Sequence, residues 1–311
     1  MKQEIDIDAI KRHLGKGEFK DAIKVQSNIR SSLSEFFKSK GYLEIPPVII
    51  SPLTDPLNHP SLDAHIDYYG IPYILTKSMI FHKQIAVQYL DKIFAFSPNI
   101  RLETIDKNET GRHLSEFTQF DLEKKYGTRA EMIKIVEDFL VYLIEKINIS
   151  NCEELTRLNR VLNVPHRPFK QIKYLDALSL YGSEFEATLS RGLTEPFWII
   201  DIPLQHREFY DREDSSNSEI LVDMDLIYPE GFGEALSGGE REYKYEKIRE
   251  RIRKKGQEEK QFEWYLHFAE QGLEPSAGFG IGIERLTRYI CGLKRIEDTH
   301  PFPKQPGIMS L

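Results

Sequence analysis

Cysteine is scarce in this sequence, and long apolar runs, internal repeats and flexible linkers are missing from it. The 311 residues include two cysteines, Cys152 and Cys291, which are too few for a disulfide framework or a zinc site. No run approaches the roughly 18 apolar residues of a membrane span. The N-terminal residues mix both charges and lack the apolar core of a signal peptide. These features predict a protein of the reducing cytoplasm with no membrane segment.

A basic excess is also missing. The formal net charge is -7 at pH 7, whereas proteins that mainly bind nucleic acid usually carry more Lys and Arg than Asp and Glu. We therefore expect no RNA or DNA as the principal partner. The total charge leaves room for a local basic pocket that binds a small anionic substrate.

The order of the predicted elements indicates one domain over residues 1–311, with residues 1–20 as an N-terminal extension and 150–180 as a small helical insertion. Apolar spacing predicts helices over residues 19–40, 77–90, 129–147, 241–272 and up to about 292. Strand-like stretches cover residues 42–45, 68–76, 93–96, 117–123, 198–202, 220–228 and 233–237. Because the strands cluster in runs, we expect an α+β fold with a largely antiparallel sheet.

Charged side chains crowd residues 100–123, where two strand-like stretches flank a polar loop. The polar candidates are Arg101, Glu103, Arg112, His113, Glu116 and Asp121. Guanidinium groups bind phosphate oxygens with paired hydrogen bonds, and Phe117 offers a ring on which a purine can stack. The pattern indicates a nucleotide site, and the alternative is a charged hairpin whose surface ion pairs contribute little.

Two glycine-containing segments add to this pattern. Residues 278–292 begin with glycines at alternate positions and continue into a helix with Glu284 and Arg285. Glycine allows the backbone to approach a ligand closely, and a helix start favours anions. The alternative is a glycine-rich bend before a core helix.

In residues 231–242, Glu234 and Ser237 lie three positions apart, followed by Arg241. A carboxylate and a hydroxyl oxygen suit Mg²⁺, which prefers oxygen ligands. The alternative is a polar loop with one capping serine.

In this order, the three segments resemble the catalytic core of class II aminoacyl-tRNA synthetases, and best the aspartyl/asparaginyl subgroup. Residues 101–123 resemble motif 2, residues 278–285 motif 3 and residues 30–47 motif 1, while the ending at 296–304 places Lys304 where the family has arginine. The resemblance covers nearly the whole chain. It implies an antiparallel sheet flanked by helices, a homodimer, and ATP-dependent adenylate formation by positioning and charge neutralisation.

The resemblance also implies a role for each matching residue. Arg101 would hold the α-phosphate and the reacting carboxylate, Phe117 and Glu103 the adenine, and His113 and Arg285 the distal phosphates. The implied ATP-binding set is Arg101, Glu103, Arg112, His113, Phe117, Glu234, Ser237, Gly282 and Arg285, with Glu234 and Ser237 holding Mg²⁺.

The amino-acid pocket follows from residues 76–84, which resemble the substrate segment of the aspartyl enzymes. Lys83 and Arg241 would bind a substrate carboxylate, and Asp121 would bind the amino group. Arg101, Arg241 and Lys83 form the implied catalytic set. The implied substrate-binding set is Ser78, Lys83, Gln119, Asp121, Arg241 and Gly278.

Two departures from the family bear on function. Motif 1 begins near residue 25, which leaves no room for an N-terminal anticodon-binding barrel. The lid after motif 1 is rebuilt within residues 51–70 around Asp55, Asn58 and His59. In both respects the chain resembles the archaeal asparagine synthetases that are related to asparaginyl-tRNA synthetase.

The sequence therefore predicts an asparagine synthetase that converts aspartate, ATP and ammonia to asparagine, AMP and pyrophosphate through β-aspartyl-adenylate, with no tRNA partner. His59, Asp55 or Asp121 could each be the base for ammonium. A second hypothesis is an anticodon-less synthetase paralogue that loads aspartate or asparagine onto a protein or tRNA. A third is a non-catalytic regulatory subunit that binds ATP or aspartate.

Overall fold

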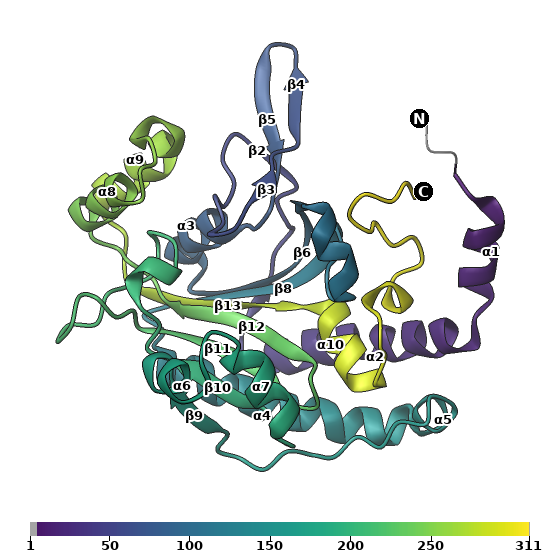
Figure 1. Ribbon diagram of the computed structural model, residues 1–311. Helices are drawn as coiled ribbons and strands as arrows, with labels where there is room; N and C mark the ends of the chain where they lie inside the picture. Colours follow the sequence, from purple (N-terminus) through teal and green to yellow (C-terminus); the bar gives the residue numbers. More distant parts are fainter. Residues whose placement is uncertain (1–4, 311) are drawn as a thin grey trace.

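An eight-stranded sheet forms the centre of the computed structural model, which describes residues 5–310 (Figure 1). The strands in spatial order are β1 (Leu43–Glu44), β6 (Lys92–Ile100), β8 (Glu116–Lys125), β13 (Ser276–Gly282), β12 (Gly233–Glu240), β11 (Asp223–Tyr228), β10 (Phe197–Ile200) and β9 (Lys170–Lys173). The two outermost pairs are parallel and all inner pairs are antiparallel. This confirms the predicted α+β class with a largely antiparallel sheet flanked by helices.

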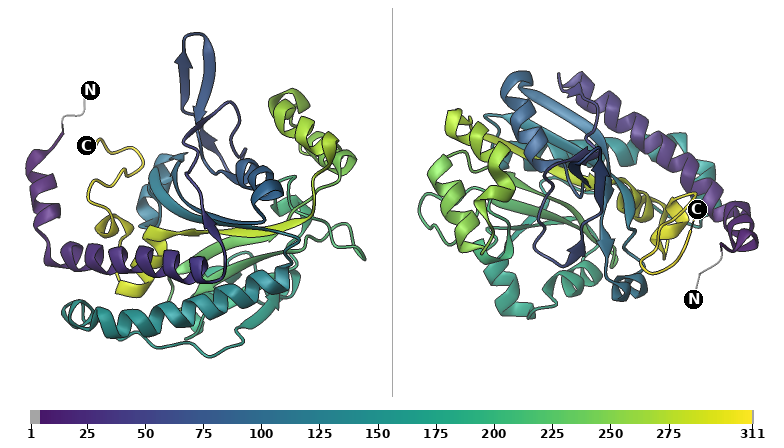
Figure 2. Two further views of the ribbon diagram at one scale, coloured as in Figure 1. Left: turned by 180° about the vertical axis from the view of Figure 1, so that it is seen from behind. Right: turned by 90° about the horizontal axis from the view of Figure 1, so that it is seen from above.

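Helices α2 (Gly17–Ser39), α4 (Arg129–Ser150) and α10 (Ile283–Cys291) cover one face of this sheet. Seen from behind in Figure 2, α2 and α4 run side by side across that face. Thr128 starts α4 with a capping box, in which its side chain and that of Glu131 each bind the other's backbone N–H. Such a cap stabilises the helix start by about 1 kcal/mol.

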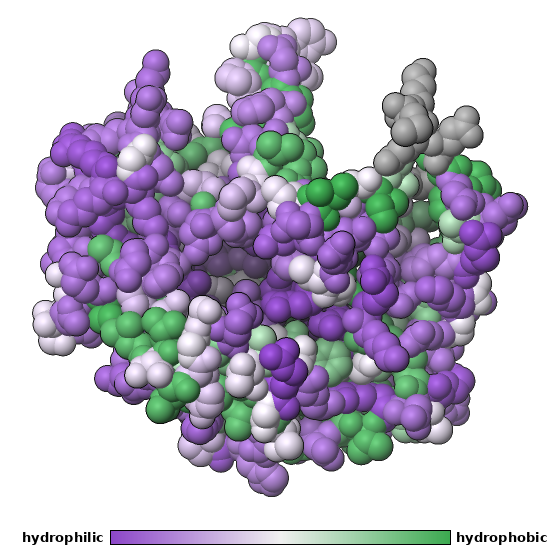
Figure 3. All heavy atoms as spheres, in the orientation of Figure 1, coloured by the Kyte–Doolittle hydropathy of each residue, from purple (hydrophilic) through white to green (hydrophobic). Residues whose placement is uncertain are grey.

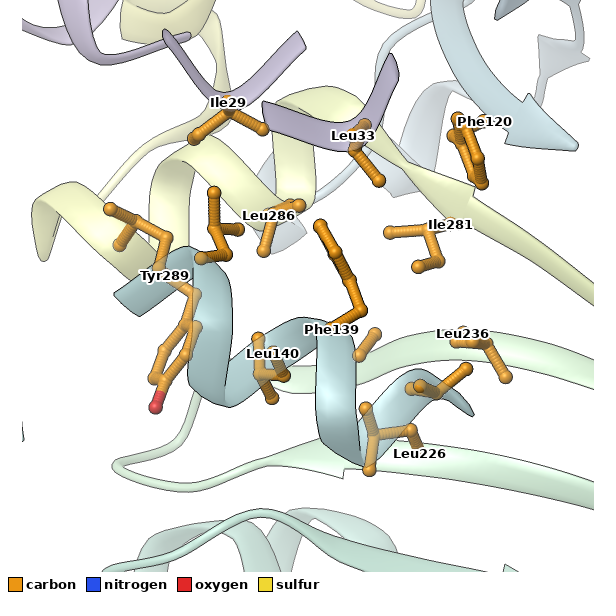
Figure 4. Close-up of a cluster of buried hydrophobic side chains, with 14 of the residues drawn as sticks. Ile29, Leu33, Phe120, Phe139, Leu140, Leu226, Leu236, Ile281, Leu286 and Tyr289 are labelled. Carbon is orange, nitrogen blue, oxygen red and sulfur yellow. The ribbon is translucent and has the colours of Figure 1, made fainter. Parts of the chain in front are cut away.

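The main hydrophobic core lies between these helices and the sheet (Figure 4). Its labelled members are Ile29, Leu33, Phe120, Phe139, Leu140, Leu226, Leu236, Ile281, Leu286 and Tyr289. Burying a side chain of this size contributes roughly 1.5–3 kcal/mol. Because side chains alternate along a strand, Phe120 and Leu122 enter the core. Their β8 neighbours Gln119 and Asp121 must therefore point to the opposite face.

That opposite face is overhung by α3 (Ile80–Leu90), α8 (Tyr245–Lys254), α9 (Glu263–Gly272) and the hairpin of β4 (His65–Tyr68) and β5 (Ile71–Leu75) (Figure 1). A second core joins α3, α8 and α9, with Phe81, Phe209 and Tyr265 fully buried. The short strands β2 (Ile50–Ser51), β3 (Ser61–Leu62) and β7 (Leu102–Glu103) complete the overhang; β2 pairs with β5 and β3 with β7.

The remaining elements lie at the periphery. They are α1 (Ile7–Gly15), α5 (Cys152–Arg157), α6 (Tyr174–Tyr181), α7 (Phe185–Gly192) and the 3-10 helices η1 (Ile105–Thr110), η2 (Leu204–His206), η3 (Glu259–Phe262) and η4 (Ile296–Thr299). Residues 1–4 of the predicted N-terminal extension lie outside the described part of the chain. Within residues 5–310, no helix combines the length and the apolar character needed to cross a membrane.

Two segments differ in detail from the sequence-based expectation. Residues 150–180 contain α5 and most of α6, but between them the chain runs extended into β9, which pairs with β10 as the edge of the main sheet. Residues 278–282 are not a bend but part of the central strand β13. A Cβ added at Gly278 would lie 2.1 Å from the carbonyl oxygen of Leu122. Glycine is therefore needed there for close strand packing.

Candidate active site

A cavity of about 440 Å³ opens on the overhung face of the sheet. Figure 3 shows a hollow on this side of the molecule, surrounded mostly by hydrophilic residues. The predicted site residues that line the cavity are Ser78, Lys83, Arg101, Glu103, Arg112, His113, Phe117, Gln119, Asp121, Glu234, Ser237, Arg241, Gly282 and Arg285. The structure thus brings together side chains that lie up to about two hundred positions apart in the sequence.

Gly278 is the exception, and the expectation that it binds substrate is not matched by its position. It is absent from the cavity lining, and a Cβ there would lie 2.0 Å from Oε2 of Glu123. Its neighbour Gly280 does line the cavity, where a Cβ would lie 2.6 Å from Nε2 of Gln119. Gly278 therefore serves strand packing, whereas Gly280 keeps space beside Gln119.

Arg101 lines the cavity, and its charge acts on both Asp55 and Glu234. Its Nε donates to the backbone oxygen of Lys77 at 3.1 Å, and its guanidinium carbon lies 5.2 Å from the centre of the Phe117 ring. One oxygen of Glu103 is 3.3 Å from Nε2 of His59, and its other oxygen is buried without a partner among the described residues. An unpaired buried acceptor of this kind is available to an N–H donor of a base.

Three basic side chains form the phosphate-binding candidate end of the cavity: Arg112, His113 and Arg285. Burial lowers the pKa of His113 to about 4, and the charges of Arg285 and Arg112 add to this effect. His113 is therefore neutral near pH 7, so the positive charge of this end comes from the two arginines. Their fixed charges suit a polyphosphate, because guanidinium groups pair with phosphate oxygens.

Glu234 and Ser237, the two predicted Mg²⁺ ligands, lie on β12 and line the cavity. Burial acts to raise the pKa of Glu234, but four guanidinium groups, foremost those of Arg285 and Arg112, hold it at about 2. Nη1 of Arg285 lies 3.4 Å from Oε2 of Glu234. An ionised carboxylate and a hydroxyl beside an arginine-lined cavity fit Mg²⁺ that arrives with phosphates. Among residues 5–310, no three His, Cys, Asp or Glu side chains form a metal site by themselves.

Asp225 was missed in the sequence. It lies opposite Ser237 in the pairing of β11 with β12, its side chain is hydrogen-bonded to Ser237, and the charge of Glu234 adds to its raised pKa, which is mainly due to burial. Asp223 and Asp225 both bind Arg207, at 2.8 and 2.5 Å. Two carboxylates within an otherwise apolar strand were the available signal, since acidic residues are almost never buried without a partner.

Lys83 and Arg241 line the other end of the cavity. Nζ of Lys83 donates to Oδ1 of Asp121 at 2.8 Å and to the backbone oxygen of Phe279 at 3.1 Å. Arg241 pairs with Glu123 and with Asp211. The two cations expected to receive a carboxylate are thus present, but each already contacts acidic side chains.

The lid residues Asp55, Asn58 and His59 form hydrogen bonds with other parts of the cavity wall. Both oxygens of Asp55 accept from the hydroxyl of Tyr210, at 3.2 and 3.1 Å, and Asn58 donates to the backbone oxygen of His206 at 2.7 Å. His59 contacts Glu103. Burial raises the pKa of Asp55, and the nearby charge of Arg101 opposes that rise. These contacts hold the segment in the wall of the cavity.

A largely antiparallel sheet that carries one cavity with an arginine-lined end and an acidic-and-basic end defines an adenylate-forming ligase of the class II synthetase type. The family model described as tRNA synthetases class II (D, K and N) matches residues 2–306, so the chain belongs to this family.

Individual proteins that resemble this chain are asparagine–tRNA ligases. The asparagine–tRNA ligases of Thermoplasma acidophilum and Koribacter versatilis are each 29% identical over 304 residues, with 92% and 91% of this chain and 70% and 68% of those proteins covered. The crystal structure of Pyrococcus horikoshii asparaginyl-tRNA synthetase complexed with asparaginyl-adenylate is 25% identical with a TM-score of 0.89, covering 97% of this chain and 72% of that one.

These relatives contradict two expectations. They are asparagine–tRNA ligases and not asparagine synthetases, so the expected lack of a tRNA partner and the choice of ammonia as acceptor were wrong. The expectation of no nucleic-acid partner rested on the net charge. A total of -7 does not describe the charge of any one surface, and the local potential decides which ligand binds.

Proposed function

We propose that this chain uses ATP and Mg²⁺ to activate asparagine or aspartate as an aminoacyl-adenylate and transfers the aminoacyl group to tRNA. The observation that carries the proposal is the order of side chains along one cavity. Glu234, which pairs with Arg285, lies near the start of β12, whereas Arg241 directly follows the end of that strand. The charge of Arg101 acts both on Glu234 and on Asp55 of the lid. The names of the similar proteins support the amino acid and the acceptor.

In the proposed reaction, a carboxylate oxygen of the amino acid attacks the α-phosphorus of ATP and pyrophosphate leaves. Arg101 would contact both the attacking carboxylate and the α-phosphate, which reduces their repulsion and sets the angle of approach. Arg112 and Arg285 would neutralise the charge that accumulates on the leaving pyrophosphate. No side chain needs to act as a nucleophile.

The adenine would stack on Phe117, and Glu103 would accept from its amino group through the buried oxygen that has no partner among residues 5–310. Glu234 and Ser237, with Asp225 beside them, would hold Mg²⁺, which supplies charge neutralisation of the phosphates when bound. The lid contacts of Asn58 with His206 and of Asp55 with Tyr210 would exclude water from the adenylate.

We also propose that the chain works as a homodimer. The projecting hairpin of β4 and β5 (Figure 1) exposes Tyr68, Tyr69 and Ile71, and the edge strand β1 of the main sheet exposes Leu43. Tyr69 is 90% exposed. Exposed apolar surface of this kind marks an association site.

The experiment is a set of matched reactions with the purified chain, ATP, Mg²⁺ and asparagine or aspartate, with and without tRNA. The proposal expects AMP release that depends on the amino acid and aminoacyl-tRNA as the product. If ammonium alone yields free asparagine from aspartate while tRNA stays uncharged, the acceptor part of the proposal fails although the adenylate part stands.

A further inference from the structure

Asp211 lies at the amino-acid end of the cavity and has no part in the function proposed so far. It belongs to the loop between β10 and β11, and its backbone forms a bridge with that of Arg241. The side chain is 5% exposed and lines the cavity. Oδ1 of Asp211 accepts from Nη1 of Arg241 at 2.8 Å.

Together with Glu123, this contact occupies both edges of the Arg241 guanidinium at which a carboxylate could bind with two hydrogen bonds. Its Nε lies 3.2 Å from Oε1 of Glu123, and its Nη2 lies 3.4 Å from Oε2 of the same carboxylate. With Nη1 bound to Asp211, both edges of the guanidinium are engaged by carboxylates. A substrate carboxylate would therefore have to displace an existing ion pair before it could bind in the paired geometry that arginine favours.

The net charge of the side chains at this end also disfavours a substrate carboxylate. Two cations, Lys83 and Arg241, contact three carboxylates, Asp121, Glu123 and Asp211, which gives a net charge of -1 for the group. All five residues are at most 5% exposed. A bare substrate carboxylate placed among them would add a second uncompensated negative charge in a poorly solvated site, which is unfavourable.

The surrounding charges do not reverse this balance. Arg251 directs its hydrogen bonds to the backbone oxygens of Asp211 and Glu208, and Arg207 is paired with Asp223 and Asp225. Glu208 and Asp55 face the same region. Burial raises the pKa of both, and the charge of Asp211 contributes in the same direction.

Carboxylate oxygens at this end also remain available to accept hydrogen bonds from a ligand. Oδ2 of Asp121 is buried with no hydrogen-bond partner among residues 5–310. Asp211 uses only Oδ1 for Arg241. A buried carboxylate oxygen without a donor is costly, at about 1–3 kcal/mol or more. A ligand that brings N–H groups would remove this penalty.

We propose that Asp211 is a specificity residue, which makes this end of the cavity select a group that carries N–H donors beside an oxygen acceptor. The donors would bind Asp211 and Asp121, and the oxygen would bind Lys83 and the remaining N–H groups of Arg241. The inference rests on the proposed function and refines the substrate of that same site.

Two substrate arrangements present this chemistry. Asparagine does so with its side-chain carboxamide when its α-carboxylate faces Arg101 and ATP. Aspartate does so with its α-ammonium and α-carboxylate when its side-chain carboxylate faces Arg101. Aspartate bound with its side-chain carboxylate at Asp211 is the arrangement that is excluded.

The test traps the adenylate with hydroxylamine, whose nitrogen attacks the acyl carbon and releases AMP, so the hydroxamate identifies the activated carboxyl group. The full chain is compared with Asp211→Asn and with the control Asp214→Asn. Asp214 is in the same loop, but its carboxylate binds Ser216 and does not line the cavity. Pyrophosphate exchange gives kcat/KM for each amino acid and KM for ATP.

We expect the α-hydroxamate of asparagine or the β-hydroxamate of aspartate from the wild-type chain, which separates the two arrangements. Asp211→Asn should lower kcat/KM for that amino acid about 10- to 100-fold, because a charged hydrogen bond is lost, with KM for ATP unchanged. Asp214→Asn should behave as wild type. Preferred formation of the α-hydroxamate of aspartate, or equal kinetics of Asp211→Asn and wild type, would overturn the inference.

Two further experiments distinguish failure of this inference from failure of the proposed function. If wild type shows no exchange with either amino acid, the proposed function fails, and equal calorimetric affinity of wild type and Asp211→Asn for the two amino acids then removes the role of Asp211 as well. If Asp211→Asn does not fold, the wild-type chain is tested with succinate, which offers carboxylates without nitrogen. Succinate should inhibit at least about 10-fold more weakly than asparagine or aspartate; equal inhibition contradicts the inference.

Discussion

Nη1 of Arg285 lies 3.4 Å from Oε2 of Glu234, so the first turn of α10 and the strand β12 meet at the phosphate-binding candidate end of the cavity. Arginine charge keeps the pKa of Glu234 at about 2 against the effect of burial. The carboxylate is therefore charged at every pH at which the protein would work, as a ligand for Mg²⁺ must be.

Replacing Glu234 by Gln should raise the Mg²⁺ concentration needed for half-maximal pyrophosphate exchange at least about 10-fold, because a neutral amide oxygen is a weaker ligand for a hard cation. Titration of the exchange rate with Mg²⁺ measures this. Glu230→Gln, which removes an exposed carboxylate paired with Arg160, is the control. An unchanged Mg²⁺ requirement in Glu234→Gln would remove this residue from the metal site.

Arg101→Ala should reduce adenylate formation by about 100-fold or more, because one side chain contacts both reacting groups in the proposed reaction. Arg101→Lys should recover little of the loss, since an ammonium lacks the planar fork. Single-turnover release of pyrophosphate at saturating ATP checks both variants. Near-normal rates for Arg101→Ala would exclude the assigned role, and Arg253→Ala, on the exposed side of α8, controls for loss of a positive charge.

Stability should fall on acidification because of His82. Burial lowers its pKa to about 4, from the usual value of 6.5, and its Nδ1 is buried without a hydrogen-bond partner among residues 5–310. Between these two values the unfolded chain binds a proton that the folded chain does not, so the free energy of unfolding decreases as the pH falls from about 6.5 to 4. The contribution is at most about 3 kcal/mol.

Denaturant unfolding at pH 7 and pH 4.5 tests this for wild type and His82→Gln. Gln keeps a polar group near Ser51, which contacts Nε2 of His82 at 3.0 Å, but does not titrate. The variant should lose less stability between the two pH values than wild type does. An identical loss would show that His82 is not responsible.

The dimer proposal predicts a molar mass of about twice 36.3 kDa in light scattering at micromolar concentration. Tyr69→Asp should shift the protein toward monomer, because burying a charge without a partner is unfavourable. Leu180→Asp, at an exposed apolar residue of α6, should leave the mass unchanged. A monomeric wild type would contradict the proposal directly.

Much of the fold was predictable because local patterns and tertiary packing agree. The apolar spacing of residues 19–40 predicts α2, which the structure places at Gly17–Ser39, and Phe37 of this helix is fully buried. Residues 77–90 were expected to be helical, but α3 begins only at Ile80. The reason is tertiary: the backbone N–H of Lys77 is bound by the hydroxyl of Thr54, a contact that no local pattern reveals.

The candidate site was predictable where a residue carries a motif and not where packing defines its surroundings. Arg101, Glu234 and Arg285 line the cavity as expected. The ion pairs of Arg241 were not foreseen, because Asp211 lies thirty positions away in sequence and reaches Arg241 only through an isolated bridge. Residue types alone therefore suggested a carboxylate receptor, whereas the structure shows an end with net negative charge.

Amino-acid-dependent exchange of pyrophosphate into ATP by the purified wild-type chain tests the central claim most directly, because this exchange requires reversible adenylate formation and no acceptor. We predict exchange in the presence of Mg²⁺ with asparagine or aspartate and none when the amino acid is left out. No exchange with either of the two amino acids, at concentrations that saturate the related ligases, would contradict the account.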